Sequence, residues 1–351
     1  MKKFISRLLV TVTATMFVLT GCGKDEQIEY INKGIKEIEA TNYATALEHL
    51  NAASEISSEG MALYRAYGLA YMGMSEYEKA VEAFEHALTY SSGELTDYEY
   101  DINYYLATAY YKCGMYKEAE AVYSAILALK PEERDAYYLR GVVELTNGEH
   151  DAAVEDFEKA ISLDRNDYSI YINIYTTLAE YGYEEEGIQY LNSVMASENS
   201  GMSNFDKGRV CYYLGDYANA CIYLEAAYKG SVNEEVILFL GRSYEAEGNL
   251  NYAITLYTKF LMEKSQSAMV YNQLGLCKLE QGNYKEALEA FQTAMMSENN
   301  NMMQTLKYNE IVAYEYLGEY TKALILMESY LTSYPDDVNA QREYEFLKTR
   351  A

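Results

Sequence analysis

The chain has 351 residues, with 28 lysines and arginines against 54 aspartates and glutamates, and its formal net charge is −26. Such a surface repels a phosphate backbone, so the composition excludes an electrostatic nucleic-acid binder. Hydrophobic residues make up 50% of the chain, enough for a sizeable core, and 2 prolines with 40 tyrosines and no tryptophan indicate long helices joined by short turns.

The N-terminal segment has the pattern of a signal peptide. Lys2, Lys3 and Arg7 precede an apolar run from Leu8 to Thr20, which is too short to span a bilayer. The run ends in Leu19-Thr20-Gly21-Cys22, which resembles the lipobox of bacterial lipoproteins. A secretory signal followed by a chance cysteine is the alternative.

The lipobox resemblance implies a lipid anchor at Cys22. In such proteins a diacylglycerol is attached to the cysteine through a thioether, and cleavage occurs just before it. Residues 1–21 would then be the signal peptide and residues 22–26 a lipid-anchored tether. The mature chain would lie on the extracytoplasmic face of the cell membrane, with about −29 charges, because three positive charges leave with the signal peptide.

Four further cysteines follow, at Cys113, Cys211, Cys221 and Cys277. An extracytoplasmic location permits disulfides, but these positions lack the regular spacing of a disulfide framework, and the chain has no CxxC motif. The pattern favours buried free thiols that act as small apolar residues. Cys211 and Cys221 are the only pair close enough in sequence for a bridge to be worth testing.

The rest of the chain repeats itself with a period of about 34 residues. The segment from Tyr67 to Leu88 aligns with the segment from Leu274 to Met295, and the same order of residues recurs along nearly the whole chain. One column holds only small residues: Ala46, Ala80, Ala119, Ala153, Gly187, Ala220, Ala253, Ala287 and Ala323.

A second column of mostly small residues precedes the first by twelve positions. It reads Gly34, Gly68, Ala107, Gly141, Tyr175, Gly208, Gly241, Gly275 and Ile311. Two helices approach closely where both present small side chains, so the two columns predict the crossing point of a helical hairpin. Between them, Gly114, Gly148, Gly182, Gly215, Gly248, Gly282 and Gly318 predict the turn. Large apolar residues, such as Leu50, Phe84, Phe157 and Phe291, recur after the turn and are expected to fill the core.

This pattern resembles the tetratricopeptide repeat, with tyrosine in place of the usual tryptophan, over residues 27–337. The resemblance implies an all-α fold, a right-handed superhelical solenoid of about nine helical hairpins. Departures from the pattern are Tyr175 and Ile311 in a small column, and prolines that close a repeat only at Pro131 and Pro335. Ser91–Tyr98 inserts residues between the second and third repeats. Residues 338–351 are expected to form a polar-faced capping helix.

Residues typical of catalysis do not come together in the repeat frame. His49, His86 and His150 occupy three different positions of the repeat, and none has a histidine or cysteine at the spacing of metal ligands. Phosphate-binding and nucleophile motifs are missing from the sequence. We therefore expect no enzyme activity, no cofactor and no metal.

In the tetratricopeptide family the first helix of each repeat lines a concave groove. The resemblance therefore implies a partner-binding surface at first-helix residues that lie outside the packing columns, although such side chains also fill a narrow superhelix. The candidates are Tyr104, Thr108, Tyr111, Tyr138, Asn173, Thr176, Phe205, Arg209, Tyr212, Leu238, Arg242 and Asn272. Tyrosine and arginine are prominent in protein recognition.

Arg209 and Arg242 occupy the same position in adjacent repeats, which predicts either an anion-binding pair or two arginines neutralised by Asp206 or Glu245. The lysine–asparagine pair with which some relatives clamp C-terminal carboxylates is not found. We expect a membrane-anchored scaffold for protein or peptide partners, as in envelope or surface-machinery assembly. A lipoprotein that binds cell-wall glycan or a solute is the alternative, in which tyrosine rings would meet sugar faces.

Overall fold

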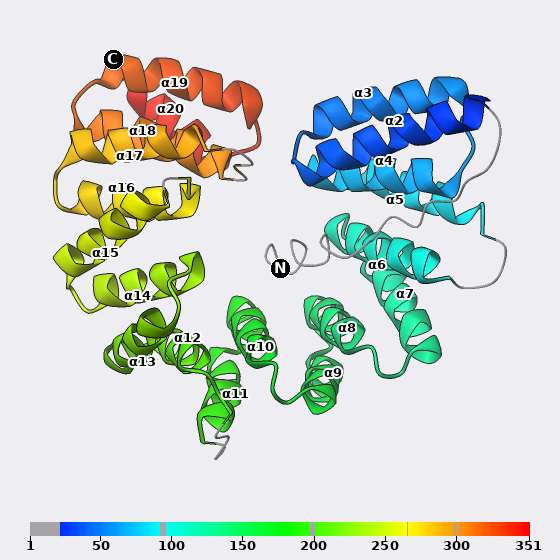
Figure 1. Ribbon diagram of the computed structural model, residues 1–351, viewed down its shortest axis with the longest axis horizontal. Coiled ribbons are helices and arrows are strands. Elements are labelled where there is room, and N and C mark those ends of the chain that lie inside the picture. The colour runs from blue at the N-terminus through cyan, green and yellow to red at the C-terminus, as the bar shows by residue number, and fades with distance from the viewer. Residues whose placement is uncertain (1–21, 92–95, 197–200, 265, 298–299, 301) are drawn as a thin grey trace. The chain divides into compact units, whose positions relative to one another are not determined.

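The computed structural model describes residues 22–91, 96–196, 201–264, 266–297, 300 and 302–351. These residues form nineteen helices, and none of them lies in a strand (Figure 1). The expected signal peptide, residues 1–21, and residues 92–95 of the insertion lie outside them. The chain divides into two compact units: unit 1 ends at Val194, and unit 2 begins at Met195. The all-α fold class predicted from the repeat is confirmed.

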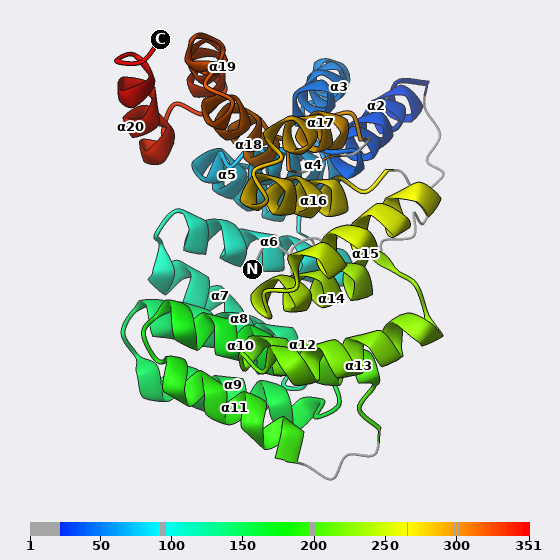
Figure 2. The same ribbon diagram turned by 90° about the vertical axis from the view of Figure 1, so that its left-hand side faces the viewer.

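Unit 1 is a stack of antiparallel helical hairpins in chain order (Figures 1 and 2). An even-numbered helix opens each hairpin and is called its first helix. The helices are α2 (Cys22–Glu39), α3 (Tyr43–Ile56), α4 (Met61–Gly73), α5 (Tyr77–Leu88), α6 (Asp97–Lys112), α7 (Tyr116–Leu129), α8 (Arg134–Thr146), α9 (His150–Leu163), α10 (Tyr168–Glu180) and α11 (Glu184–Ala196).

Unit 2 continues with four hairpins and one further helix that packs on α19. Its helices are α12 (Asn204–Tyr213), α13 (Tyr217–Gly230), α14 (Glu234–Ala246), α15 (Leu250–Glu263), α16 (Ala268–Glu280), α17 (Tyr284–Met295), α18 (Met303–Tyr316), α19 (Tyr320–Ser333) and α20 (Val338–Leu347). Within the described part of the chain, no helix is long and apolar enough to cross a membrane.

The helices of a hairpin cross where the two small columns meet. A Cβ atom added to Gly68 of α4 would lie 2.4 Å from Cε1 of Phe84, a fully buried ring of α5. Tyr175 of α10 breaks the column, and the structure shows the compensation. Gly187 of α11 lies against it, because an added Cβ there would be 3.0 Å from the Tyr175 Cα. The fifth repeat thus accommodates the large Tyr175 on its first helix because its second helix has glycine, without a Cβ, where the other repeats have alanine.

Most hairpin turns place a glycine in the left-handed region, for example Gly148 at φ 81°. The first two repeats place Thr41 (φ 60°) and Ser75 (φ 62°) in this region instead. A β-branched residue is strained there because its side chain crowds the backbone. The first hairpin turn therefore has backbone strain at Thr41, and glycine at this position would remove that strain.

We expect Thr41→Gly to raise the free energy of unfolding by about 0.5 to 1 kcal/mol, since relief of the strained φ exceeds the added freedom of the unfolded chain. Thr45→Gly is the matched control. It lies on the exposed side of α3, where glycine should cost about 0.5 to 1 kcal/mol. Urea unfolding of the three proteins measures both changes, and equal signs for the two variants would contradict the strain argument.

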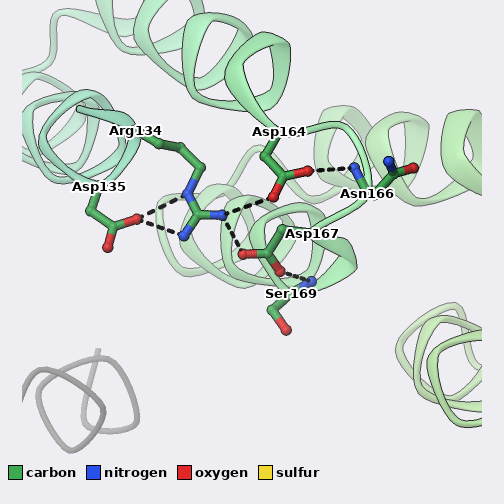
Figure 3. A network of polar contacts seen from close by, with 6 residues as sticks. All are labelled: Arg134, Asp135, Asp164, Asn166, Asp167 and Ser169. Carbon is green, nitrogen blue, oxygen red and sulfur yellow. Dashed lines mark hydrogen bonds and ion pairs between the residues drawn. The ribbon is translucent and has the colours of Figure 1, made fainter. Parts of the chain in front are cut away.

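A polar network ties the start of α8 to the turn before α10 (Figure 3). The Arg134 guanidinium donates from Nη1 to Asp167 Oδ2 at 2.6 Å, and from Nη2 and Nε to Asp135 Oδ1 at 2.9 and 3.0 Å. Asp167 also caps α10, because its Oδ1 accepts from the Ser169 N–H at 3.0 Å. The network holds together the first helices of the fourth and fifth repeats.

The four cysteines are free thiols, as the spacing pattern favoured. Cys211, Cys221 and Cys277 are buried, and Cys113 is half-buried. Cys211 and Cys221 lie on α12 and α13 and form no bridge.

The cap α20 differs in part from the polar-faced helix expected at the C-terminus. Ala340 and Leu347 are buried, but Val338 is 55% and Phe346 is 43% exposed. These two residues lie eight positions apart, on one face of the helix. The outer surface of α20 therefore carries apolar side chains as well as charges.

Candidate functional site

Two of the groove residues predicted in unit 1 belong to the core. Tyr104 is 8% and Tyr138 is 2% exposed. The Tyr138 hydroxyl lies 2.9 Å from Thr177 Oγ1 on α10, the first helix of the next repeat. A side chain of the next first helix thus covers Tyr138, and the burial of both rings corrects the expectation that the two residues line an open surface.

Three other predicted residues of unit 1 are half-buried polar side chains. Thr108 and Thr176 donate to carbonyls of their own helices, those of Tyr104 and Asn173, each at 2.9 Å. Asn173 is also half-buried. These bonds use the O–H donor of each threonine, and the hydroxyl oxygens can still accept.

Tyr111 joins a cluster of hydroxyl groups from three repeats of unit 1. Its hydroxyl lies 3.3 Å from that of Tyr181, which in turn lies 2.5 Å from Thr146 Oγ1. Tyr181 is 37% exposed, so the cluster reaches the surface. Thr146 and Tyr181 were not predicted as site residues, because each lies at a helix end next to a turn.

In unit 2, Arg209 lies among aromatic rings and has an acidic neighbour. Its guanidinium lies over Phe205 and Phe239, 5.3 and 5.7 Å from the ring centroids, and Nη1 is 3.5 Å from Asp206 Oδ1. Tyr212 meets Phe239 edge to face at 5.5 Å. Asp206 supports the interpretation in which this arginine is neutralised within the protein.

Arg242 also lies near a carboxyl group. Burial raises the pKa of Glu245, against the opposing effects of Tyr257, Cys277 and Arg242. The prediction that Arg209 and Arg242 form an anion-binding pair therefore loses support, because each arginine has an acidic neighbour.

Two further predicted residues of unit 2, Leu238 and Asn272, are buried, at 6% and 3% exposed, and do not form an accessible surface. Asn272 Oδ1 accepts a hydrogen bond from Asn309 on α18 at 2.8 Å. As with Tyr138, a side chain from the next first helix covers the position.

An open pocket of about 540 Å³ lies beyond Asn309, between α18, the end of α19 and α20. We call it the C-terminal pocket. Its lining residues are Gln304, Thr305, Tyr308, Asn309, Tyr330, Asp337, Asn339, Arg342 and Glu343.

The C-terminal pocket continues the surface that the repeat frame predicts. Tyr308 lies three residues before Ile311 of the second column, as Tyr104, Phe205 and Asn272 lie before their column positions, and Arg342 follows Tyr308 by about one repeat period. The candidate residues predicted from the repeat end at Asn272. Extending the same frame by two first helices would have found both residues.

Several polar groups of the C-terminal pocket have no partner within the described part of the chain. Arg342 is exposed and makes no hydrogen bond or ion pair with a described residue, and the Tyr308 hydroxyl is likewise unbonded. Tyr330 and Asp337 are engaged. The Tyr330 hydroxyl donates to Asp337 Oδ2 at 2.6 Å and accepts from Gln304 Nε2 at 3.2 Å. Free and engaged groups together form a polar concavity suited to a ligand.

The predicted lipidation site lies at the start of α2, which begins at Cys22. Residues 22–26, expected to be a tether, are therefore helical. No described residues form a group of three or more histidines, cysteines, aspartates or glutamates placed to hold a metal ion.

Comparison with known families identifies the hairpins. Residues 63–93, 104–168 and 268–301 match models of the tetratricopeptide repeat. These three segments, which cover less than half of the chain, therefore match tetratricopeptide repeats, as the residue columns indicated, and the fold of the described residues is all-α.

Known relatives are distant in sequence. A TPR repeat-containing protein of Methanocaldococcus jannaschii is 24% identical over 247 residues, which cover 66% of this chain and 42% of the relative. The match thus spans less than half of that protein. A solved tetratricopeptide repeat protein from Parabacteroides merdae is 17% identical, with a TM-score of 0.45 over 82% of this chain and 99% of that one. Pseudomonas aeruginosa pilF is 20% identical, with a TM-score of 0.41 over 65% of this chain and 100% of that one.

Proposed function

We propose that the chain is a membrane-anchored, extracytoplasmic scaffold that binds a protein or peptide segment on its first-helix surface, in envelope or surface-machinery assembly. The observation that carries the binding role is the C-terminal pocket, where Tyr308 and Arg342 present unengaged polar groups on the predicted binding surface. The lipobox-like segment ending at Cys22 supports the anchor.

A capture experiment with a pocket variant tests the binding role. The chain from Cys22 onward is immobilised and exposed to a detergent extract, and Tyr308→Ala is compared with Tyr316→Ala. Tyr316 lies on the same helix but is 59% exposed and stacks on Tyr284 outside the pocket. We expect a protein band that Tyr308→Ala loses and Tyr316→Ala keeps. Retention on purified wall material, with no such band, would instead support the glycan-binding alternative.

The anchor is tested by Cys22→Ser. We expect this variant to lose lipid labelling and to move from the membrane fraction to the soluble fraction, because serine cannot form the thioether. Cys113→Ser, which changes a half-buried thiol, is the control and should remain in the membrane fraction. A Cys22→Ser protein that stays fully membrane-bound through a high-salt wash would rule out the lipoprotein assignment.

A further inference from the structure

The C-terminal pocket contains carboxyl groups that no described cation neutralises. Asp337 and Glu343 line the pocket, and Glu315 of α18 lies against Glu343. Arg342 is the cation of the lining, and it forms no ion pair with any of the three carboxyl groups among the described residues. The wall therefore has an excess of negative charge.

Asp337 contributes a fixed charge. Its Oδ2 accepts from Tyr330, and its Oδ1 accepts from the backbone N–H groups of Asn339 and Ala340 at 3.1 and 3.0 Å. The hydrogen bonds from Tyr330 and from Ala340 lower the pKa of Asp337. This carboxyl group is thus ionised near neutral pH while it caps α20.

Glu315 and Glu343 are two like groups held together by helices α18 and α20. The side chain of Glu315 is partly buried, and its Oε1 is buried without a hydrogen-bond partner. Burial and then Glu343 raise the pKa of Glu315 to about 7. Two neighbouring carboxyl groups repel each other when both are ionised, and a cation bound beside Glu343 would offset that repulsion.

Tyr308 provides a ring close to the same carboxyl groups. Tyr308 lines the C-terminal pocket together with Glu343, and burial, then Glu343 and Glu315, raise the pKa of its phenol. The face of a tyrosine ring attracts cations. A cation in the C-terminal pocket would therefore meet the carboxyl group of Glu343 and the ring of Tyr308, with Glu315 next to Glu343 but outside the lining.

We propose that the C-terminal pocket binds the ammonium group of a lysine-bearing peptide segment, between Glu343, whose negative charge Glu315 reinforces, and the ring of Tyr308. The inference rests on the proposed binding role and names the chemistry of the partner. An anionic segment is disfavoured because the three carboxyl groups would repel it. A divalent cation is disfavoured because no described residues form a metal-holding group.

Binding of a labelled N-acetyl tetralysine amide to the mature chain at low salt tests the proposal. We expect Glu343→Gln to weaken binding about tenfold, the loss of one charge-assisted contact. Glu345→Gln is the matched control, because Glu345 is exposed on the same helix and pairs with Lys348 at 2.8 Å. Equal weakening by the two variants would mean attraction by the general acidic surface and would overturn the proposal.

Substitution of Arg342 is expected to change tetralysine affinity in the opposite direction from Glu343→Gln. Arg342→Ala should tighten tetralysine binding, because it removes a positive charge from the pocket lining. Weaker binding by this variant, or binding of N-acetyl tetraglutamate amide in place of tetralysine, would assign the pocket to anions. Competition by Ca²⁺ at micromolar concentration would assign it to metal. Either result overturns the proposal.

The pH dependence of binding isolates the carboxyl pair. Tetralysine affinity should rise between pH 6 and 8 as Glu315 loses its proton beside Glu343, because the raised pKa of Tyr308 keeps its phenol protonated and the lowered pKa of Asp337 keeps that group ionised over this range. In Glu315→Gln the rise should be largely lost, and an unchanged rise would contradict the proposed site.

If Tyr308→Ala abolishes capture of a partner but tetralysine does not bind, only the ligand chemistry is wrong. If neither capture nor tetralysine binding occurs, the binding role itself fails.

Discussion

Leucine in place of Ala119 is expected to lower the free energy of unfolding by about 1 to 3 kcal/mol. Ala119 of α7 is completely buried and lies in the small column, opposite Ala107 of α6, which is also completely buried. The two helices pack closely because neither presents a large side chain at the crossing. Three extra carbon atoms have no space there, so the helices must separate or adopt strained rotamers.

Ala121→Leu is the matched control, because Ala121 lies two residues further along α7 and is exposed. This variant should unfold within about 0.5 kcal/mol of the unmodified chain. Urea unfolding measures the two free energies, and amide hydrogen exchange should place the damage in α6, α7 and their neighbours, since repeats couple mainly to adjacent repeats. Equal stability of the two variants would show that the small column is assigned to the wrong residues.

The repeat columns predicted the fold because each encodes a local contact. Small residues at the helix crossing and a glycine at φ > 0 in the turn are needed in every hairpin, so they recur visibly in the sequence. The exceptions could not be interpreted from one column alone. The large Tyr175 fits at the helix crossing because Gly187 lies beside it, which the second column alone does not show. Thr41 keeps the turn conformation without the glycine that marks it in other repeats.

The candidate site was less predictable, because the exposure of a first-helix side chain depends on the following helix. Tyr138 and Tyr308 occupy equivalent repeat positions. Thr177 from α10 covers Tyr138, whereas Tyr308 borders an open pocket next to α20. Periodicity identifies the position in the repeat, but the pairing of side chains between neighbouring repeats decides which positions are open to a partner.

A buried carboxyl group in unit 1, that of Glu144, predicts that the stability of this unit depends strongly on pH. Glu144 of α8 is 7% exposed, and its Oε2 has no hydrogen-bond partner. Asp156 of α9 lies next to it and is held by two hydrogen bonds from Arg140, at 2.7 and 2.8 Å. Burial, then Asp156, raise the pKa of Glu144 to about 7, with Arg140 opposing and Glu120 of α7 adding to the rise.

This raised pKa predicts that alkalinity weakens unit 1. The folded protein binds the Glu144 proton more tightly than the unfolded chain, whose glutamates titrate near 4.5. The stabilisation is therefore fully present below about pH 4.5 and is lost as pH rises through about 7. The loss is about 1 to 3 kcal/mol, reduced from the full linkage value because solvent partly screens the group.

Glu144→Gln should remove most of this pH dependence, because the amide cannot titrate yet keeps the shape of the protonated carboxyl group. Glu155→Gln, an exposed change on α9, is the control and should retain it. Glu315 of unit 2 has a pKa raised to about 7 as well, so hydrogen exchange at amides of α8 and α9 is the appropriate measurement, compared between pH 5 and 8 after correction for intrinsic rates. A pH-dependent loss of protection in Glu144→Gln as large as in the unmodified chain would show that Glu144 does not titrate over this range and that another group controls the pH response.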